Sequence, residues 1–125
     1  MRALLLFLSL WLAACVPSGV VLQDMRHVQG DEWRRDDHMT FVLDSAAEGH
    51  QLWVMARVNG RFYYDTLWLK VGRDTIGIPA TAMRGKSLRQ GEWRVGRAHS
   101  GKLTIMHLMH SNPLPGVTEV GVKVE

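Results

Sequence analysis

The sequence predicts an all-β protein, an antiparallel β-sandwich of about seven or eight strands preceded by a cleaved signal segment. Two observations support this fold. Four stretches alternate apolar and polar side chains with a period of two, which is typical of strands with one buried face. Turn formers separate these stretches, and no segment carries a convincing apolar stripe of helical period.

The four strongest strands are defined by their apolar rows. These rows are Met39, Phe41 and Leu43; Leu52, Val54, Ala56 and Val58; Leu67, Leu69 and Val71; and Thr118, Val120, Val122 and Val124. Weaker strands are predicted at residues 20–28, 92–98 and 102–109. Asn59-Gly60 predicts a two-residue hairpin, and Ser100-Gly101 another tight turn. Residues 80–90 are predicted to form a loop with one helical turn at most.

The N-terminus has the features of a bacterial lipoprotein signal. Arg2 precedes a short apolar run, which is too short to span a bilayer. Leu12, Ala13 and Ala14 then fit a signal cleavage motif in front of Cys15. We therefore expect cleavage before Cys15 and attachment of lipid, including fatty acyl chains such as palmitate, to its thiol.

The domain organisation follows from this signal. Residues 1–14 are predicted to be the signal peptide, residues 15–30 a lipidated tether with a first strand, and residues 31–125 the sandwich. The stretch between Cys15 and Asp24 contains no acidic residue, which favours an outer-membrane lipoprotein that faces the periplasm. An ordinary secreted protein with a free cysteine is the alternative.

Composition and charge exclude some classes of function. The net charge is +3, and the basic residues are scattered without any run longer than two. This pattern argues against nucleic-acid binding, which needs a concentrated basic patch. Cys15 is the only cysteine in the chain, so intramolecular disulfides and multi-cysteine zinc sites are excluded.

The titratable residues do not form a recognisable catalytic or metal motif. His107 and His110 are three apart, which on a strand predicts opposite faces, one buried and one exposed. Asp44-Ser45 is interpreted as a turn cap, although His50 follows closely. Asp36-Asp37 resembles only one edge of a calcium loop. We therefore predict no enzymatic activity, no cofactor and no metal site.

The tryptophans suggest a binding surface instead. Trp53 and Trp68 lie opposite the apolar rows of their strands, and Tyr64 precedes the second of these strands. If all three faced solvent, they would form an aromatic platform that stacks on sugars or anchors a partner protein. The alternative is a second buried layer beneath the loops.

Several stretches resemble the gliding-motility lipoprotein H (GldH) family of Bacteroidetes. They are Trp33 with Asp37, residues 41–44 and 55–59, residues 61–69 (RFYYDTLWL), residues 107–110 (HLMH) and residues 114–125 (LPGVTEVGVKVE). The chain is shorter than that family between Thr75 and Gly91, and His110 stands where the family has arginine. The resemblance implies a β-sandwich lipoprotein of the gliding and type IX secretion apparatus, with no established enzymatic residues.

These observations lead to one main hypothesis and two rivals. The main hypothesis is a non-catalytic, membrane-anchored accessory protein of an envelope assembly, docking to other envelope proteins through strand edges or an aromatic patch. The first rival is a carbohydrate-binding surface lipoprotein that uses the aromatic platform. The second is a small hydrolase or metalloenzyme, which would need histidines and a carboxylate converging in one pocket.

Overall fold

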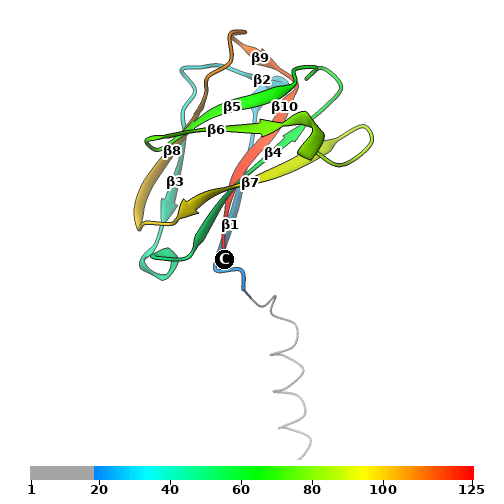
Figure 1. The fold of residues 1–125 in the computed structure, drawn as a ribbon. Helices are drawn as coiled ribbons and strands as arrows, with labels where there is room; N and C mark the ends of the chain where they lie inside the picture. Colours follow the sequence, from blue (N-terminus) through cyan, green and yellow to red (C-terminus); the bar gives the residue numbers. More distant parts are fainter. Residues whose placement is uncertain (1–18) are drawn as a thin grey trace, which may run out of the picture.

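A computed structural model describes residues 19–125 as two antiparallel four-stranded sheets packed face to face (Figure 1). Sheet I has the strand order β1-β10-β4-β7 and sheet II the order β3-β8-β5-β6. In chain order their bounds are β1 (Leu22–His27), β3 (Met39–Leu43), β4 (Gln51–Val58), β5 (Thr66–Val71), β6 (Asp74–Pro79), β7 (Arg89–Arg97), β8 (Gly101–His107) and β10 (Val117–Val124). Two short strands, β2 (Glu32–Trp33) and β9 (Leu114–Pro115), pair with each other. The predicted all-β sandwich is confirmed.

The predicted apolar rows form the core between the two sheets. Every member of the four rows is buried, with Phe41, Val54, Leu67, Leu69 and Val122 fully so. Because side chains alternate across a strand, the rows point inward and their neighbours point out of the sandwich. Trp33, Phe62 and Leu114 close one end of this core.

Strand β6 is the strand that the alternation pattern does not reveal. Its sequence includes Gly77 and ends at Pro79, two residues that are disfavoured inside strands. Both are tolerated because β6 is an edge strand of sheet II, paired only with β5. The space left by Gly77 is used by a tryptophan described below.

The predicted hairpin at Asn59-Gly60 is wrong. The strands on either side, β4 and β5, belong to different sheets, so the connection crosses the sandwich. Asn59 does form a local turn, because its side-chain oxygen accepts from the N–H of Arg61 at 2.9 Å. After this turn Phe62 is buried in the core, and the chain continues to Thr66, where β5 of the other sheet begins. The connection around Ser100-Gly101 is short, but it also joins the two sheets.

Residues 80–90 contain one short 3-10 helix at Ala80–Ala82, as predicted, before β7 begins. Asp44 caps a second short 3-10 helix (Ser45–Ala47) by accepting from the N–H of Ala46 at 3.0 Å. This contact confirms its interpretation as a turn cap.

The sandwich has two distinct ends (Figure 1). The basal end comprises the start of β1, the end of β10 and the connections at residues 44–50, 72–73 and 98–100. The distal end comprises the connections at residues 28–38, 59–65, 80–88 and 108–116. Both termini of the described chain therefore lie at the basal end, where the N–H of Val21 donates to the carbonyl of Val124 at 2.8 Å.

Candidate functional site

The outer face of sheet II carries an exposed tryptophan held in a fixed position. Trp68 lies between Leu67 and Leu69, which are fully buried, so strand alternation directs its ring outward, where it is 48% exposed. The ring rests against Gly77 of the neighbouring strand, where a Cβ atom would lie 2.9 Å from the ring atom Cζ3. Only glycine leaves room for the ring there, so the edge strand and the tryptophan fit each other.

Leu108 extends this surface on the other side of Trp68. Its N–H donates to the carbonyl oxygen of Trp68 at 2.9 Å, and its side chain is 41% exposed. The N–H of Trp68 in turn contacts the sulfur of Met109 at 3.3 Å. Trp68 and Leu108 together form an exposed apolar surface that we call the Trp68 patch. Gly77 of β6 lies against the Trp68 ring, and Leu108, which directly follows the other neighbouring strand β8, is hydrogen-bonded to the Trp68 backbone.

Polar side chains surround the Trp68 patch on the same face. Thr66 and Lys70 flank Trp68 along β5, and Thr75 pairs with Lys70 from β6. Further along sheet II, Thr40 and Thr104 lie with their hydroxyl oxygens 3.5 Å apart. The outer face of sheet II therefore carries several threonine hydroxyls together with exposed apolar side chains, among them Trp68 and Val42.

Trp53 does not belong to this surface. It lies in β4 on the outer face of sheet I, which is the opposite side of the sandwich. The Lys123 ammonium sits 5.4 Å from its ring centroid and also pairs with Glu92 at 3.0 Å. The indole Nε1 of Trp53 is buried and has no hydrogen-bond partner among the described residues. Trp53 is thus partly buried on sheet I, on the opposite side of the sandwich from Trp68.

Tyr64 is partly buried against the core. Its ring packs against the core beside the buried Phe62, and its hydroxyl hydrogen-bonds to Ser111. The exposed ring at this point is Tyr63, which stacks on Tyr64 with 5.4 Å between centroids. Of the three predicted platform residues, the structure presents only Trp68, so the single platform of Trp53, Tyr64 and Trp68 does not form.

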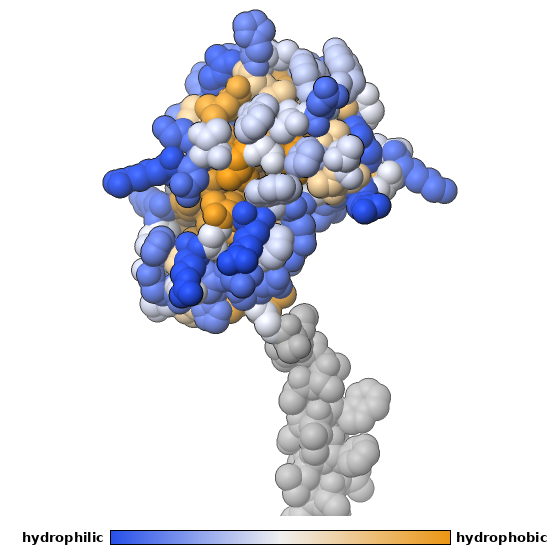
Figure 2. Space-filling view, viewed as in Figure 1, coloured by the Kyte–Doolittle hydropathy of each residue, from blue (hydrophilic) through white to orange (hydrophobic). Residues whose placement is uncertain are grey.

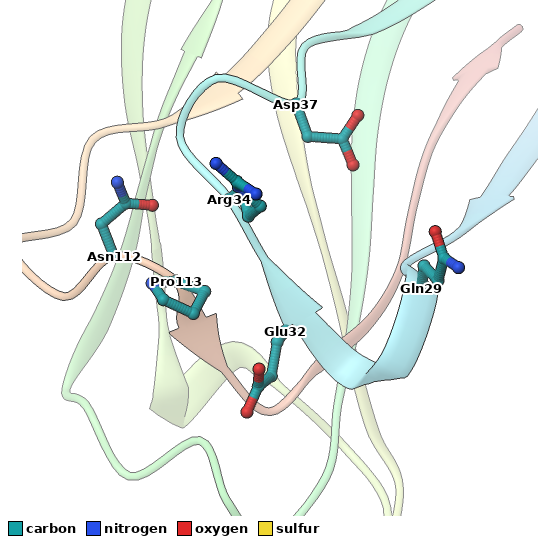
Figure 3. Close-up of a pocket in the computed structure, with 6 residues that line it drawn as sticks. All are labelled: Gln29, Glu32, Arg34, Asp37, Asn112 and Pro113. Atoms are coloured by element: carbon teal, nitrogen blue, oxygen red, sulfur yellow. The ribbon is translucent and has the colours of Figure 1, made fainter.

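A polar cleft of about 430 Å³ opens at the distal end (Figure 3). Its lining residues are Gln29, Glu32, Arg34, Asp37, Asn112 and Pro113. Most of its charged groups are already paired, because Glu32 binds Arg61 at 3.0 Å and Arg34 binds Asp36 at 3.2 Å. The cleft is therefore wide and polar, but it has few free charges.

A buried histidine lies under the distal connections. His107 is fully buried, and its Nε2 lies 3.0 Å from the carbonyl oxygen of Trp33 while the N–H of Met109 donates to Nδ1 at 3.2 Å. These partners fit a neutral ring with the proton on Nε2. Burial lowers the pKa of His107, the hydrogen bond that Nε2 donates to the Trp33 carbonyl opposes this shift, and the nearby Arg35 charge lowers the pKa further.

Arg35 ties the same residues to the neighbouring loop. Its guanidinium donates to the carbonyl of Met109, and its N–H donates to Asn112 Oδ1 at 2.8 Å. We call Trp33, Arg35, His107, Met109 and Asn112 the distal knot. His110 is exposed beyond it, as the spacing from His107 predicted. The knot combines residues about 75 positions apart, so no local sequence pattern could have indicated it.

The other residues predicted as candidate sites do not converge in the described chain. Residues 19–125 contain no group of three or more histidine, cysteine or acidic residues close enough to hold a metal. Asp36 is held by Arg34, and His50 is exposed. Leu12, Ala13, Ala14 and Cys15 lie outside the described residues. Within the described residues, no helix is long and apolar enough to cross a membrane.

Comparison of the chain with protein-family models, with curated proteins and with solved structures finds no match.

Proposed function

We propose that this chain is a non-catalytic outer-membrane lipoprotein, anchored by lipid on Cys15, that docks to other envelope proteins through the Trp68 patch. It would serve as an accessory component of an assembly of the gliding-motility or type IX secretion type, as the resemblance to the GldH family implies. The observation that carries the docking part is a half-exposed tryptophan immobilised on the outer face of sheet II.

The physical argument rests on pre-organisation. Tryptophan is among the residues that contribute most to protein interfaces, and ordering a free side chain on binding costs about 0.5–1.5 kcal/mol. The Trp68 ring already rests against Gly77 of the neighbouring strand, so part of that cost is met before binding. Thr66 and Lys70 supply the polar rim that such hot spots usually have.

The arrangement of the ends supports the anchoring part. The described chain begins at the basal end, four residues after Cys15, while Trp68 lies in the distal half of β5. A lipid at Cys15 would therefore hold the basal end near the membrane and leave the outer face of sheet II open to a partner. A tag placed after Glu125 would also lie at the basal end, away from the Trp68 patch.

The anchor is tested by mass spectrometry of the mature protein produced in its native membranes. We expect a chain that begins at Cys15 and carries diacylglycerol with an additional acyl group. A full-length chain with a free thiol would contradict the proposal.

The docking surface is tested by co-purification from native membranes through a C-terminal tag, followed by identification of the captured proteins. We expect Trp68→Ala to lose envelope proteins that the unchanged chain retains. Trp93→Ala is the matched control, because Trp93 is similarly exposed, at 42%, on the edge strand of sheet I. Equal capture by both variants would contradict docking through the Trp68 patch.

A second candidate function is carbohydrate binding. It is favoured by one observation, the threonine hydroxyls that share the outer face of sheet II with an exposed indole ring. Glycan-array binding that is lost in Trp68→Ala, without any captured protein, would favour this alternative over protein docking.

A further inference from the structure

A second hollow lies at the basal end, between the two sheets. It has a volume of about 450 Å³, within the range of small-ligand sites. Its floor is apolar, formed by the buried Leu43, Leu52 and Val71 with the partly buried Val95 and Leu103. In Figure 2, apolar surface bordered by hydrophilic side chains lies on the left of the view, between the turn joining β5 to β6 and strand β7.

The rim of this hollow is basic. Arg73, Arg97 and Lys102 line it, and none of them forms an ion pair or a side-chain hydrogen bond with a residue of the described chain. Asp74 is the one acidic residue in the lining. His99, also at the rim, is held by Glu48 at 3.2 Å. Three unpaired cations above an apolar floor form a surface that complements an amphiphilic anion.

The position of the hollow identifies the source of such an anion. The three cations come from the β5–β6 turn and from the strand ends that adjoin the β7–β8 connection, all at the basal end. Four residue steps separate Gly19 from Cys15, which at full extension span at most about 14 Å. A lipid on Cys15 would therefore bring this end, and the hollow with it, to the headgroup layer of the bilayer.

We propose that the basal hollow binds an anionic phospholipid of the anchoring membrane. The phosphate contacts Arg73, Arg97 and Lys102, and the start of an acyl chain lies on the apolar floor. This inference rests on the proposed lipid anchor for its biological setting, while the binding itself can be measured separately.

The test is a titration of the full-length chain, purified in detergent, with short-chain phosphatidylglycerol, followed by amide NMR shifts. We expect saturable shifts at Gly72, Gly96 and Lys102, which line the hollow. Short-chain phosphatidylcholine and inorganic phosphate are expected to bind at least tenfold more weakly. The first lacks net charge, and the second cannot use the apolar floor.

Charge variants provide the matched comparison. Replacing Arg73, Arg97 and Lys102 with glutamine should weaken phosphatidylglycerol binding at least tenfold. Replacing Arg34, Arg84 and Lys86, which lie in the distal connections, with glutamine removes the same charge away from the hollow and should leave the affinity within about twofold. An equal loss in both triple variants would overturn the proposal, and so would equal binding of phosphatidylcholine or of phosphate alone. The mass of Cys15 in the same sample reports on the anchor independently, so either idea can fail alone.

Discussion

At the scale of single residues, His107 shows how the sandwich satisfies a polar group in its core. The ring fills the interior beside Trp33, with 5.3 Å between ring centroids in an edge-on arrangement. Both ring nitrogens have partners only in the neutral state, because protonated Nδ1 could no longer accept from the N–H of Met109. The distal knot is therefore built for an uncharged histidine.

This arrangement predicts that stability falls in mild acid. The folded-state pKa of His107 lies below the ordinary value of 6.5, mainly because the ring is buried. The unfolded chain thus binds the proton first, so stability is full above about pH 6.5 and is lost as the pH falls from there towards the folded-state pKa. Urea unfolding at pH 7.5 and pH 5 should show this loss.

His107→Gln isolates the contribution of this ring. The variant should be less stable by about 1–3 kcal/mol at pH 7.5, since buried partners lose good hydrogen bonds. Its additional loss between pH 7.5 and pH 5 should be smaller than that of the unchanged protein. An equal loss in the two proteins would show that other groups, and not His107, cause the acid sensitivity.

At the scale of elements, the attachment of β1 to sheet I depends on a glycine in β10. Gly121 pairs with Met25, and a Cβ atom there would lie 2.2 Å from the Met25 sulfur and 2.4 Å from the carbonyl oxygen of Asp24. The sulfur belongs to a flexible side chain, but the carbonyl belongs to the strand itself. Strand β1 can therefore lie close to β10 only because position 121 has no side chain.

Gly121→Ala should loosen β1 and destabilise the protein by about 1–3 kcal/mol, the usual cost of overpacking. Hydrogen exchange should be accelerated most strongly at the β1 amides. Gly60→Ala is the control, because a Cβ atom at that position meets nothing within 4 Å, and its stability should change by less than about 0.5 kcal/mol. Uniform acceleration across both sheets would mean that β1 is not the weak element.

The elements also show what local sequence could and could not predict. The alternation of apolar and polar residues predicted the buried rows correctly, because successive side chains of a strand point to opposite faces of the sheet. It missed β6, where Gly77 and Pro79 conceal an edge strand that Trp68 covers. The hairpin prediction at Asn59-Gly60 was wrong. The local sequence does specify a turn there, but the following chain crosses to the other sheet and buries Phe62 in the core, which a local pattern does not indicate.

At the scale of the whole molecule, the candidate sites depend on which sheet each strand joins. Trp53 and Trp68 have the same local pattern, yet β4 and β5 fall in different sheets, so the two rings lie on opposite sides of the sandwich. The basal hollow and the distal knot likewise join residues that are distant in sequence. The sequence left open whether Trp68 is exposed or covered by loops, and pairing between distant strands determined its surroundings.

The whole-molecule orientation on a membrane can be measured directly. If Cys15 is acylated, a cysteine introduced elsewhere is the only free thiol in the chain. A fluorophore on Ser100→Cys, at the basal end, should be quenched strongly by spin-labelled lipids in reconstituted vesicles. The same label on His110→Cys, at the distal end, should be quenched weakly. Equal quenching at both positions would contradict an upright sandwich.

The strand order has a consequence for when the protein can fold. Of all the pairings in the described sandwich, only β5 with β6 joins strands that follow each other in the chain. Strand β10, the last strand of the described chain, lies between β1 and β4 and pairs with both. Sheet I is therefore incomplete until residues 117–124 are available, and such non-local pairing is intrinsically slow. If the chain is exported through a translocation channel, as the proposed lipid anchor requires, the sandwich can close only after residues 117–124 have crossed.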